Sequence, residues 1–223
     1  MPVLLEEIPF FHELSEADLS SVKERLAEKT FAKGEALFAE GNACAGTFFV
    51  KSGWIKMYRS SPAGTAQIVE TLGPGESCTC NPGALNWTCA LTGQALTPCT
   101  VWFLAKEDYV RLIQSNPRLS HLLNRIFAER LQRSSSTIAE LSSADSRKRL
   151  AHLLLELLAK STRKDSAKGV ISVPLTREEL AEMIGTSRET VVRQLYDLRR
   201  QKLIDIQSRK IVILDRQGLK KLL

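Results

Sequence analysis

The sequence predicts an α+β protein in which an N-terminal β-roll (a cupin-like jelly roll) is followed by a long dimerisation helix and a C-terminal winged helix-turn-helix. Three observations predict this order. Short apolar runs separated by Gly, Pro, Asn and Ser fill residues 30–103, a pattern typical of short strands joined by tight turns. An apolar stripe at three- and four-residue steps follows Asn116-Pro117, and residues 175–206 contain two helix starts separated by a short turn. The expected segments are 1–115, 116–141 and 142–223.

The bulk composition is that of an ordinary soluble globular protein, with 223 residues, of which 43% are hydrophobic and 25% charged. No apolar run approaches the length needed to span a bilayer. The N-terminus has two acids among its first seven residues and no basic region, so no signal peptide is expected. We therefore expect a cytoplasmic location, where thiols stay reduced. A structural disulfide framework is the poorest explanation of the five cysteines.

The charge is divided unevenly along the chain. Residues 1–141 carry 13 Lys and Arg against 15 Asp and Glu, a net charge of −2. Residues 142–223 carry 18 against 10, a net charge of +8. A solvated surface is the ordinary explanation of a basic segment, but so sharp a separation favours a polyanionic partner, and nucleic acid above others.

The first part of the chain is expected to form one short helix and then the strands. Residues 16–29 place Leu19, Val22 and Leu26 among charged residues, as in an amphipathic helix. The strands are expected in the runs ALFAEG, GTFFVKSGWIKMY, AQIVETLGPGE and TVWFLA. Many short strands separated by turn residues favour a barrel or roll.

The long helix of residues 116–141 begins at Asn116-Pro117, because Pro is tolerated in a first helical turn. Its apolar stripe needs a partner, which is either the β domain or the same stripe of a second subunit. The second alternative predicts a homodimer. Its seam would use the apolar positions Leu119, Leu122, Leu123, Ile126 and Phe127.

The C-terminal segment has the local features of a helix-turn-helix. Thr176 and Glu179 fit a capping box, which fixes the start of a first helix. Gly185 stands where a helix ends in a left-handed conformation, and Ser187 can cap the next helix. The run KLIDIQSRKIVIL alternates through a tight turn, which predicts a wing hairpin.

The second helix presents a face suited to a DNA major groove. Arg188, Glu189 and Arg193 lie within an arc of roughly 140° at the standard helical twist. Arg can bind guanine O6 and N7, and Glu can accept from the cytosine amino group. We expect these three residues to contact bases. The expected contacts to the DNA backbone are Thr176, Ser187, Arg209 and Lys210.

The segment SRETVVR is close to the recognition-helix motif of the Crp/Fnr family of bacterial transcription regulators, and the C-terminal segment resembles that family's winged helix. Gly34, Gly41 and Gly53, followed by LGPGE, resemble the family's cyclic-nucleotide-binding-type β-roll. The helix from Pro117 stands in the place of the family's dimer helix. The resemblance implies a homodimer that binds a palindromic site in double-stranded promoter DNA and contacts RNA polymerase.

The resemblance also implies a half-site preference. Arg188, Glu189 and Arg193 match positions that read the half-site in members of the cyclic-AMP receptor type, which implies TGTGA-like half-sites. Fnr-type members have Ser where this chain has Val192, which argues against their TTGAT preference.

The segment where nucleotide-binding members hold the cyclic phosphate departs from the family pattern. Gly75-Glu76 is present, but no Lys or Arg occurs from Ser60 to Ala105. A buried phosphate without a cation partner is costly, which argues against cyclic AMP as the ligand. The chain also lacks the N-terminal cysteine cluster of the oxygen-sensing Fnr members.

Cysteines occupy the segment that would hold the phosphate. Cys78, Cys80, Cys89 and Cys99 are predicted to form a sensor, most simply a thiolate site for a soft metal, a metalloid or an iron–sulfur cluster. Reversible thiol oxidation is the close alternative, and a haem site is the more distant one. The ordinary explanation is that cysteine packs as a small apolar residue, and Cys44 is assigned to such packing.

The leading prediction is a sequence-specific transcription regulator. The alternative is a ligand-binding regulatory subunit of a protein complex, in which the basic end contacts protein. No Ser/His/Asp set, Gly-rich phosphate loop or carboxylate pair is recognisable, so the chain is not expected to be an enzyme.

Overall fold

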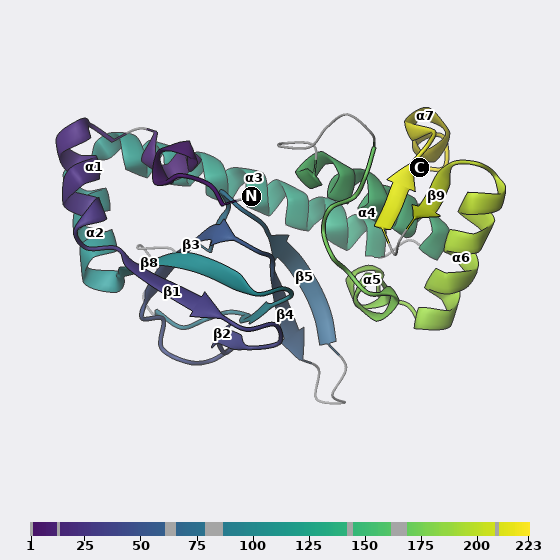
Figure 1. Ribbon diagram of the computed structural model, residues 1–223, viewed down its shortest axis with the longest axis horizontal. Coiled ribbons are helices and arrows are strands. Elements are labelled where there is room, and N and C mark those ends of the chain that lie inside the picture. The colour runs from purple at the N-terminus through teal and green to yellow at the C-terminus, as the bar shows by residue number, and fades with distance from the viewer. Residues whose placement is uncertain are drawn as a thin grey trace. The chain divides into compact units, whose positions relative to one another are not determined.

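The computed structural model describes residues 2–12, 14–60, 66–78, 87–141, 145–161, 169–207 and 210–223. The chain forms two compact units. The first comprises residues 1–59 and 69–134, and the second comprises residues 60–68 and 135–223. Figure 1 shows the strands of the first part and the mixed helices and strands of the C-terminal part. None of the described helices is long and apolar enough to cross a membrane.

The N-terminal unit is built on two four-stranded antiparallel sheets, in the orders β1-β8-β3-β6 and β2-β7-β4-β5. The strands are β1 (Ala27–Phe31), β2 (Ala36–Phe38), β3 (Gly46–Ser52), β4 (Ile55–Ser60), β5 (Ala66–Leu72), β6 (Ser77–Cys78), β7 (Thr92–Ala95) and β8 (Cys99–Ala105). The sheet order joins strands far apart in sequence: β8 pairs with both β1 and β3. The predicted fold class, a roll of short strands followed by helices, is confirmed.

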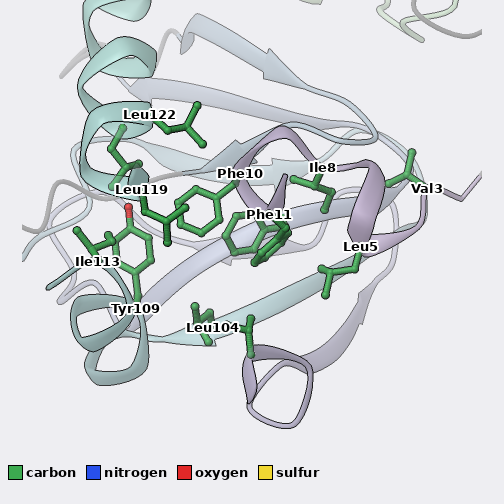
Figure 2. Close-up of a cluster of buried hydrophobic side chains, with 13 residues drawn as sticks. Val3, Leu5, Ile8, Phe10, Phe11, Leu104, Tyr109, Ile113, Leu119 and Leu122 are labelled. Carbon is green, nitrogen blue, oxygen red and sulfur yellow. The ribbon is translucent and has the colours of Figure 1, made fainter. Parts of the chain in front are cut away.

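The N-terminal segment belongs to the core of the roll. The turns η1 (Leu5–Glu7) and η2 (Pro9–Phe11) and the helix α1 (Glu16–Lys23) precede the strands. Phe10 and Phe11 are almost fully buried, and the Val3 N–H donates to the Lys51 carbonyl at 2.9 Å. Figure 2 shows these side chains converging with side chains that follow residue 104. The cluster consists of Val3, Leu5, Ile8, Phe10, Phe11, Val22, Phe49, Leu104, Tyr109, Ile113, Leu119, Leu122 and Leu123.

Two helices follow the roll, α2 (Lys106–Ser115) and α3 (Pro117–Leu141). The first turns of α3 pack onto the roll of the same chain, since Leu119, Leu122 and Leu123 are buried in the cluster of Figure 2. Two partners were expected for this apolar stripe, the β domain or a second subunit, and at these three positions the partner is the β domain. Ile126 and Phe127 pack against the same cluster and are partly buried. Among the α3 side chains that the structure describes, Leu131 is a large apolar one that is exposed in the single chain, at 70%.

The C-terminal unit combines a helix-turn-helix with a two-stranded hairpin. Its elements are α4 (Ser146–Ser161), α5 (Arg177–Ile184), α6 (Arg188–Arg200), β9 (Ile204–Gln207), β10 (Lys210–Ile213) and α7 (Arg216–Lys220). The inner faces of α4, α5 and α6 are buried, with Leu154, Leu180 and Leu195 as members. The predicted wing is the antiparallel pair β9–β10, which Val170 joins through a bridge to Val212.

Candidate DNA-binding surface and cysteine site

Helix α5 begins at the predicted capping box. The Thr176 hydroxyl accepts from the Glu179 N–H at 3.1 Å, and the Glu179 carboxylate accepts from the Thr176 N–H at 2.8 Å. These bonds satisfy donors that have no partner inside a helix. The Thr176 hydroxyl also donates to the Glu179 carboxylate, at 2.9 Å, so it is both a donor and an acceptor within the cap. A contact from Thr176 to DNA stays a prediction.

The turn between α5 and α6 follows from two residues. Gly185 has φ 61° and ψ 53°, the left-handed conformation that glycine adopts most easily, and its N–H donates to the Ala181 carbonyl. Ser187 then caps α6, where its hydroxyl accepts from the Thr190 N–H at 3.2 Å. Both caps are confirmed, and they fix α6 to begin at Arg188. The first turn of α6 is therefore set by local rules.

Helix α6 has one buried and one exposed face. Val191, Leu195 and Leu198 point inward and are 0–1% exposed. Arg188 and Glu189 have side chains that are 58% and 78% exposed. The other exposed residues on this face of α6 are Val192, Arg193, Tyr196, Arg199 and Arg200. The structure therefore brings the three predicted base-contacting residues to one exposed face.

The charged side chains Arg188 and Glu189 on this face interact only weakly with each other. Arg188 Nη1 lies 4.0 Å from Glu189 Oε1, at the outer limit of an ion pair. An exposed pair of this kind contributes at most about 1 kcal/mol, so it is broken easily by a stronger partner. Arg199 is different, because its Nε donates to Asp205 Oδ1 at 3.1 Å and ties α6 to β9. Hydrogen bonds from the Gln207 side chain and the Ile206 N–H hold the pKa of Asp205 below its usual value.

Two residues of the wing are predicted to contact the DNA backbone, and the structure describes one of them. Lys210 begins β10, is exposed, and pairs in register with Gln207. Arg209, the other predicted contact, lies outside the described residues. Tyr196 and Arg200 were not predicted as part of this surface. Their positions, seven residues after Glu189 and Arg193, are the sequence signal that would have found them.

The cysteine stretch begins in β6. Cys78 pairs with Phe48 of β3, and its carbonyl accepts from the buried Thr47 hydroxyl. The neighbouring Ser77 carbonyl accepts from Arg130 Nη2 of α3 at 2.5 Å. β6 is thus fixed from one side by the roll and from the other by the long helix. Nothing in the spacing of the sequence predicts the role of Arg130, because it is 53 residues from Ser77.

The other described cysteines lie in different surroundings. Cys89 is partly buried, and its backbone bonds to Gly41 and Asn42, with the Cys89 N–H donating to the Asn42 carbonyl at 2.9 Å. Cys99 is 3% exposed in an apolar cluster with Phe48. Cys78, Cys89 and Cys99 carry free thiols, whereas Cys44 is disulfide-bonded. Cys44 is buried, as its assignment to packing predicts, but the expectation that the thiols stay reduced is not met at this residue.

The free thiols are held in their protonated form. Burial raises the pKa of Cys78 to about 12, although the nearby Arg130 lowers it in part. Burial also raises the pKa of Cys99, to about 11, and that of Cys89. The thiolate is the form that binds metals and attacks oxidants. A soft ion would thus have to displace protons in order to bind here.

The described residues do not by themselves form a metal site. No group of three or more His, Cys, Asp or Glu able to hold a metal occurs within the described part of the chain. Cys80, the fourth predicted sensor residue, lies outside that part. The four-cysteine site therefore stays a prediction.

The N-terminal and the C-terminal parts of the chain both match known protein families. Residues 28–116 match the model of the cyclic nucleotide-binding domain, and residues 148–222 match that of the Crp-like helix-turn-helix domain. The chain is 28% identical over 225 residues to the CRP-like cAMP-activated global transcriptional regulator of Mycobacterium tuberculosis, covering 98% of each chain. It is 28% identical to the cyclic AMP receptor protein of Thermus thermophilus over 85% of each chain. FixK2 from Bradyrhizobium japonicum shares the fold at a TM-score of 0.80 and 22% identity, covering 88% of this chain and 96% of that one.

Proposed function

Because the chain belongs to the Crp/Fnr family of transcription regulators, we propose that it is a homodimer that binds a palindromic promoter site and recruits or blocks RNA polymerase there. The observation that carries the proposal is the exposed first half of α6. There Arg188, Glu189 and Arg193 share one face of a helix whose start is fixed by the Ser187 cap. The net charge of +8 on residues 142–223 suits a phosphate backbone.

The proposed half-site is the one that the resemblance to members of the cyclic-AMP receptor type implies, and the chemistry of these three side chains is compatible with it. Two arginines can each bind the O6 and N7 of a guanine, and a glutamate between them can accept from a cytosine amino group. A TGTGA-like half-site offers these groups in the major groove. Ser187 and Lys210 are exposed at the start of α6 and in the wing, and we propose that they contact phosphates.

The dimer is proposed to form through the exposed side of α3. The buried positions Leu119, Leu122 and Leu123 already pack on the roll, so the seam falls to the part of the helix that includes Leu131. An apolar side chain that is 70% exposed on a long helix is what a second α3 would cover. Leu131→Glu is expected to yield a monomer in sedimentation and to weaken binding to the full palindrome, whereas a dimer of unchanged affinity would contradict this seam.

The signal is proposed to act on the cysteine stretch, through Cys78, Cys80, Cys89 and Cys99. The names of two relatives refer to cyclic AMP, but the segment from Ser60 to Ala105 contains no Lys or Arg. Arg130 does reach this region from α3, but its Nη2 already donates to the Ser77 carbonyl. We therefore do not assign cyclic AMP as the effector.

Three chemistries are open for such a sensor: thiolate binding of a soft metal or cluster, reversible thiol oxidation and, more distantly, a haem site. In reversible thiol oxidation, two thiols form a disulfide and lose two protons and two electrons to an oxidant such as a peroxide. Anaerobic purification followed by an absorption spectrum, elemental analysis and a thiol count separates the three. A colourless, metal-free protein whose four Cys→Ser variant responds normally in a reporter assay would refute all of them.

The experiment that tests DNA binding is selection from random duplexes, followed by titration of the selected site at several salt concentrations. A regulator should return a two-fold-symmetric sequence and lose affinity steeply as salt rises, because bound counterions are released. A regulatory subunit that contacts protein through its basic end would return no sequence and show no such slope.

A further inference from the structure

The exposed face of α6 contains two large apolar side chains among its charges. Val192 is 46% exposed and Tyr196 is 66% exposed. Single exposed apolar residues are common on protein surfaces, so exposure alone carries no argument. Their position does, because they lie in the middle of the face that the proposed function assigns to DNA.

The helical twist fixes where Val192 lies on that face. At about 100° per residue, it is displaced by about 40° from Arg188, about 60° from Glu189 and about 100° from Arg193. It therefore falls inside the arc that these three residues span. Along the axis it lies about 6 Å from Arg188, within the part of a recognition helix that contacts base edges.

The side chain of Val192 is also suited to a fixed contact. A β-branched residue in a helix has one strongly preferred χ1 rotamer, so its two methyl groups point in a set direction. Arginine and glutamate on either side bind polar base edges. A valine between them can gain affinity only from an apolar group, and in the major groove that group is the thymine 5-methyl.

We propose that Val192 is a specificity-determining residue, which selects a thymine in each half-site by packing against its 5-methyl group. The inference rests on the proposed function and adds to it, since arginine and glutamate account for guanine and cytosine alone. Burying one methyl group contributes about 0.8 kcal/mol, which corresponds to about 4-fold in affinity for each half-site and about 15-fold for a palindrome.

The test replaces one thymine at a time by deoxyuridine in the selected palindrome, symmetrically in both half-sites. Deoxyuridine lacks only the 5-methyl group and keeps the hydrogen-bonding edge. The wild-type protein should lose about 15-fold at one symmetric pair of positions. Val192→Ala should bind the thymine and deoxyuridine duplexes equally, at the affinity of wild type for deoxyuridine. Because Val192 is exposed and Ala favours helix, this variant is expected to fold.

Leu214→Ala is the matched control, because Leu214 is an apolar residue of the same unit that is 57% exposed and lies outside α6. It should keep the full difference between thymine and deoxyuridine. A wild-type protein indifferent to every deoxyuridine, or a difference that persists in Val192→Ala, would overturn the inference while leaving DNA binding intact. A protein that selects no sequence at all would instead refute the proposed function, and this inference with it.

Discussion

The two candidate sites are held in place in opposite ways. In the helix-turn-helix, the contacts that position the site join residues three apart, as between Thr176 and Glu179 or Ser187 and Thr190. In the cysteine stretch, Thr47 and Arg130 hold β6 from 31 and 53 residues away. A site built from local contacts keeps its shape when the rest of the chain changes. A site built from distant contacts reports on the arrangement of several elements at once, which is what a sensor requires.

The largest effect is expected where the distant contacts meet. Leu119 is 0% exposed in the core shared by the N-terminal segment, the roll and α3, so Leu119→Ala should destabilise the N-terminal unit by about 2–5 kcal/mol. Urea unfolding followed by tryptophan fluorescence reports this unit, because Trp54, Trp87 and Trp102 all lie in it. Leu4→Ala, at an exposed apolar position of the same unit, should change stability by under about 0.5 kcal/mol. Equal losses in the two variants would refute this packing.

The next effect concerns the locally built site. Arg193→Ala should cost about 1–3 kcal/mol in binding to the preferred palindrome and should relax the choice of one base pair. Lys210→Ala should weaken binding to all sequences alike, because it is expected to contact phosphate. Both are measured by titration against matched duplexes. If random-sequence selection returned the same motif for Arg193→Ala as for wild type, Arg193 would not be a base contact.

Removal of a cap should have a smaller effect, confined to the C-terminal unit. Thr176→Ala removes the acceptor for the Glu179 N–H and should cost about 1 kcal/mol of stability. Hydrogen exchange of the first-turn amides of α5 should rise, while that of the roll stays unchanged. Glu179→Gln keeps an acceptor for the Thr176 N–H and should cost less. A loss of protection spread over both units would contradict the local character of this site.

The smallest effect should appear at high pH in the cysteine stretch. Burial raises the pKa of Cys78 from 9.0 to about 12, so the folded state holds the proton more tightly than the unfolded state. The resulting stability is fully present below pH 9 and is lost as the pH rises toward 12, by under about 1 kcal/mol at pH 9.5. Cys78→Ala should lose less stability than wild type between pH 8 and pH 9.5 in urea unfolding. Identical pH profiles would show that Cys78 is not buried in this way.

The same division explains what the sequence could predict. The caps at Thr176 and Ser187, the glycine turn at Gly185 and the exposure of Arg188 and Glu189 in the first turn of α6 depend on neighbouring residues, and all were predicted. The roll was predicted as a class from its short strands. Its sheet order was not, because no local pattern says that β8 lies between β1 and β3.

The predictions that changed all depend on distant partners. The apolar stripe of α3 was correct as a stripe, but the pattern could not distinguish a second subunit from the roll, which buries Leu119 and its neighbours. Cys44 was assigned to packing because it lies apart from the other cysteines in the sequence; it is buried, but it is also disulfide-bonded, which the spacing did not indicate. Arg130 donates to the Ser77 carbonyl although it is 53 residues away in the sequence, so the composition of the cysteine segment alone does not indicate this cation.

The burial of the N-terminal segment has a consequence for synthesis of the protein. Val3, Phe10 and Phe11 are synthesised more than 100 residues before Leu123, which belongs to the same core. At about 5–20 residues per second, this apolar segment waits roughly 6–24 s for its last partners. During that interval, this apolar segment is a potential substrate for a chaperone that holds exposed apolar segments of nascent chains.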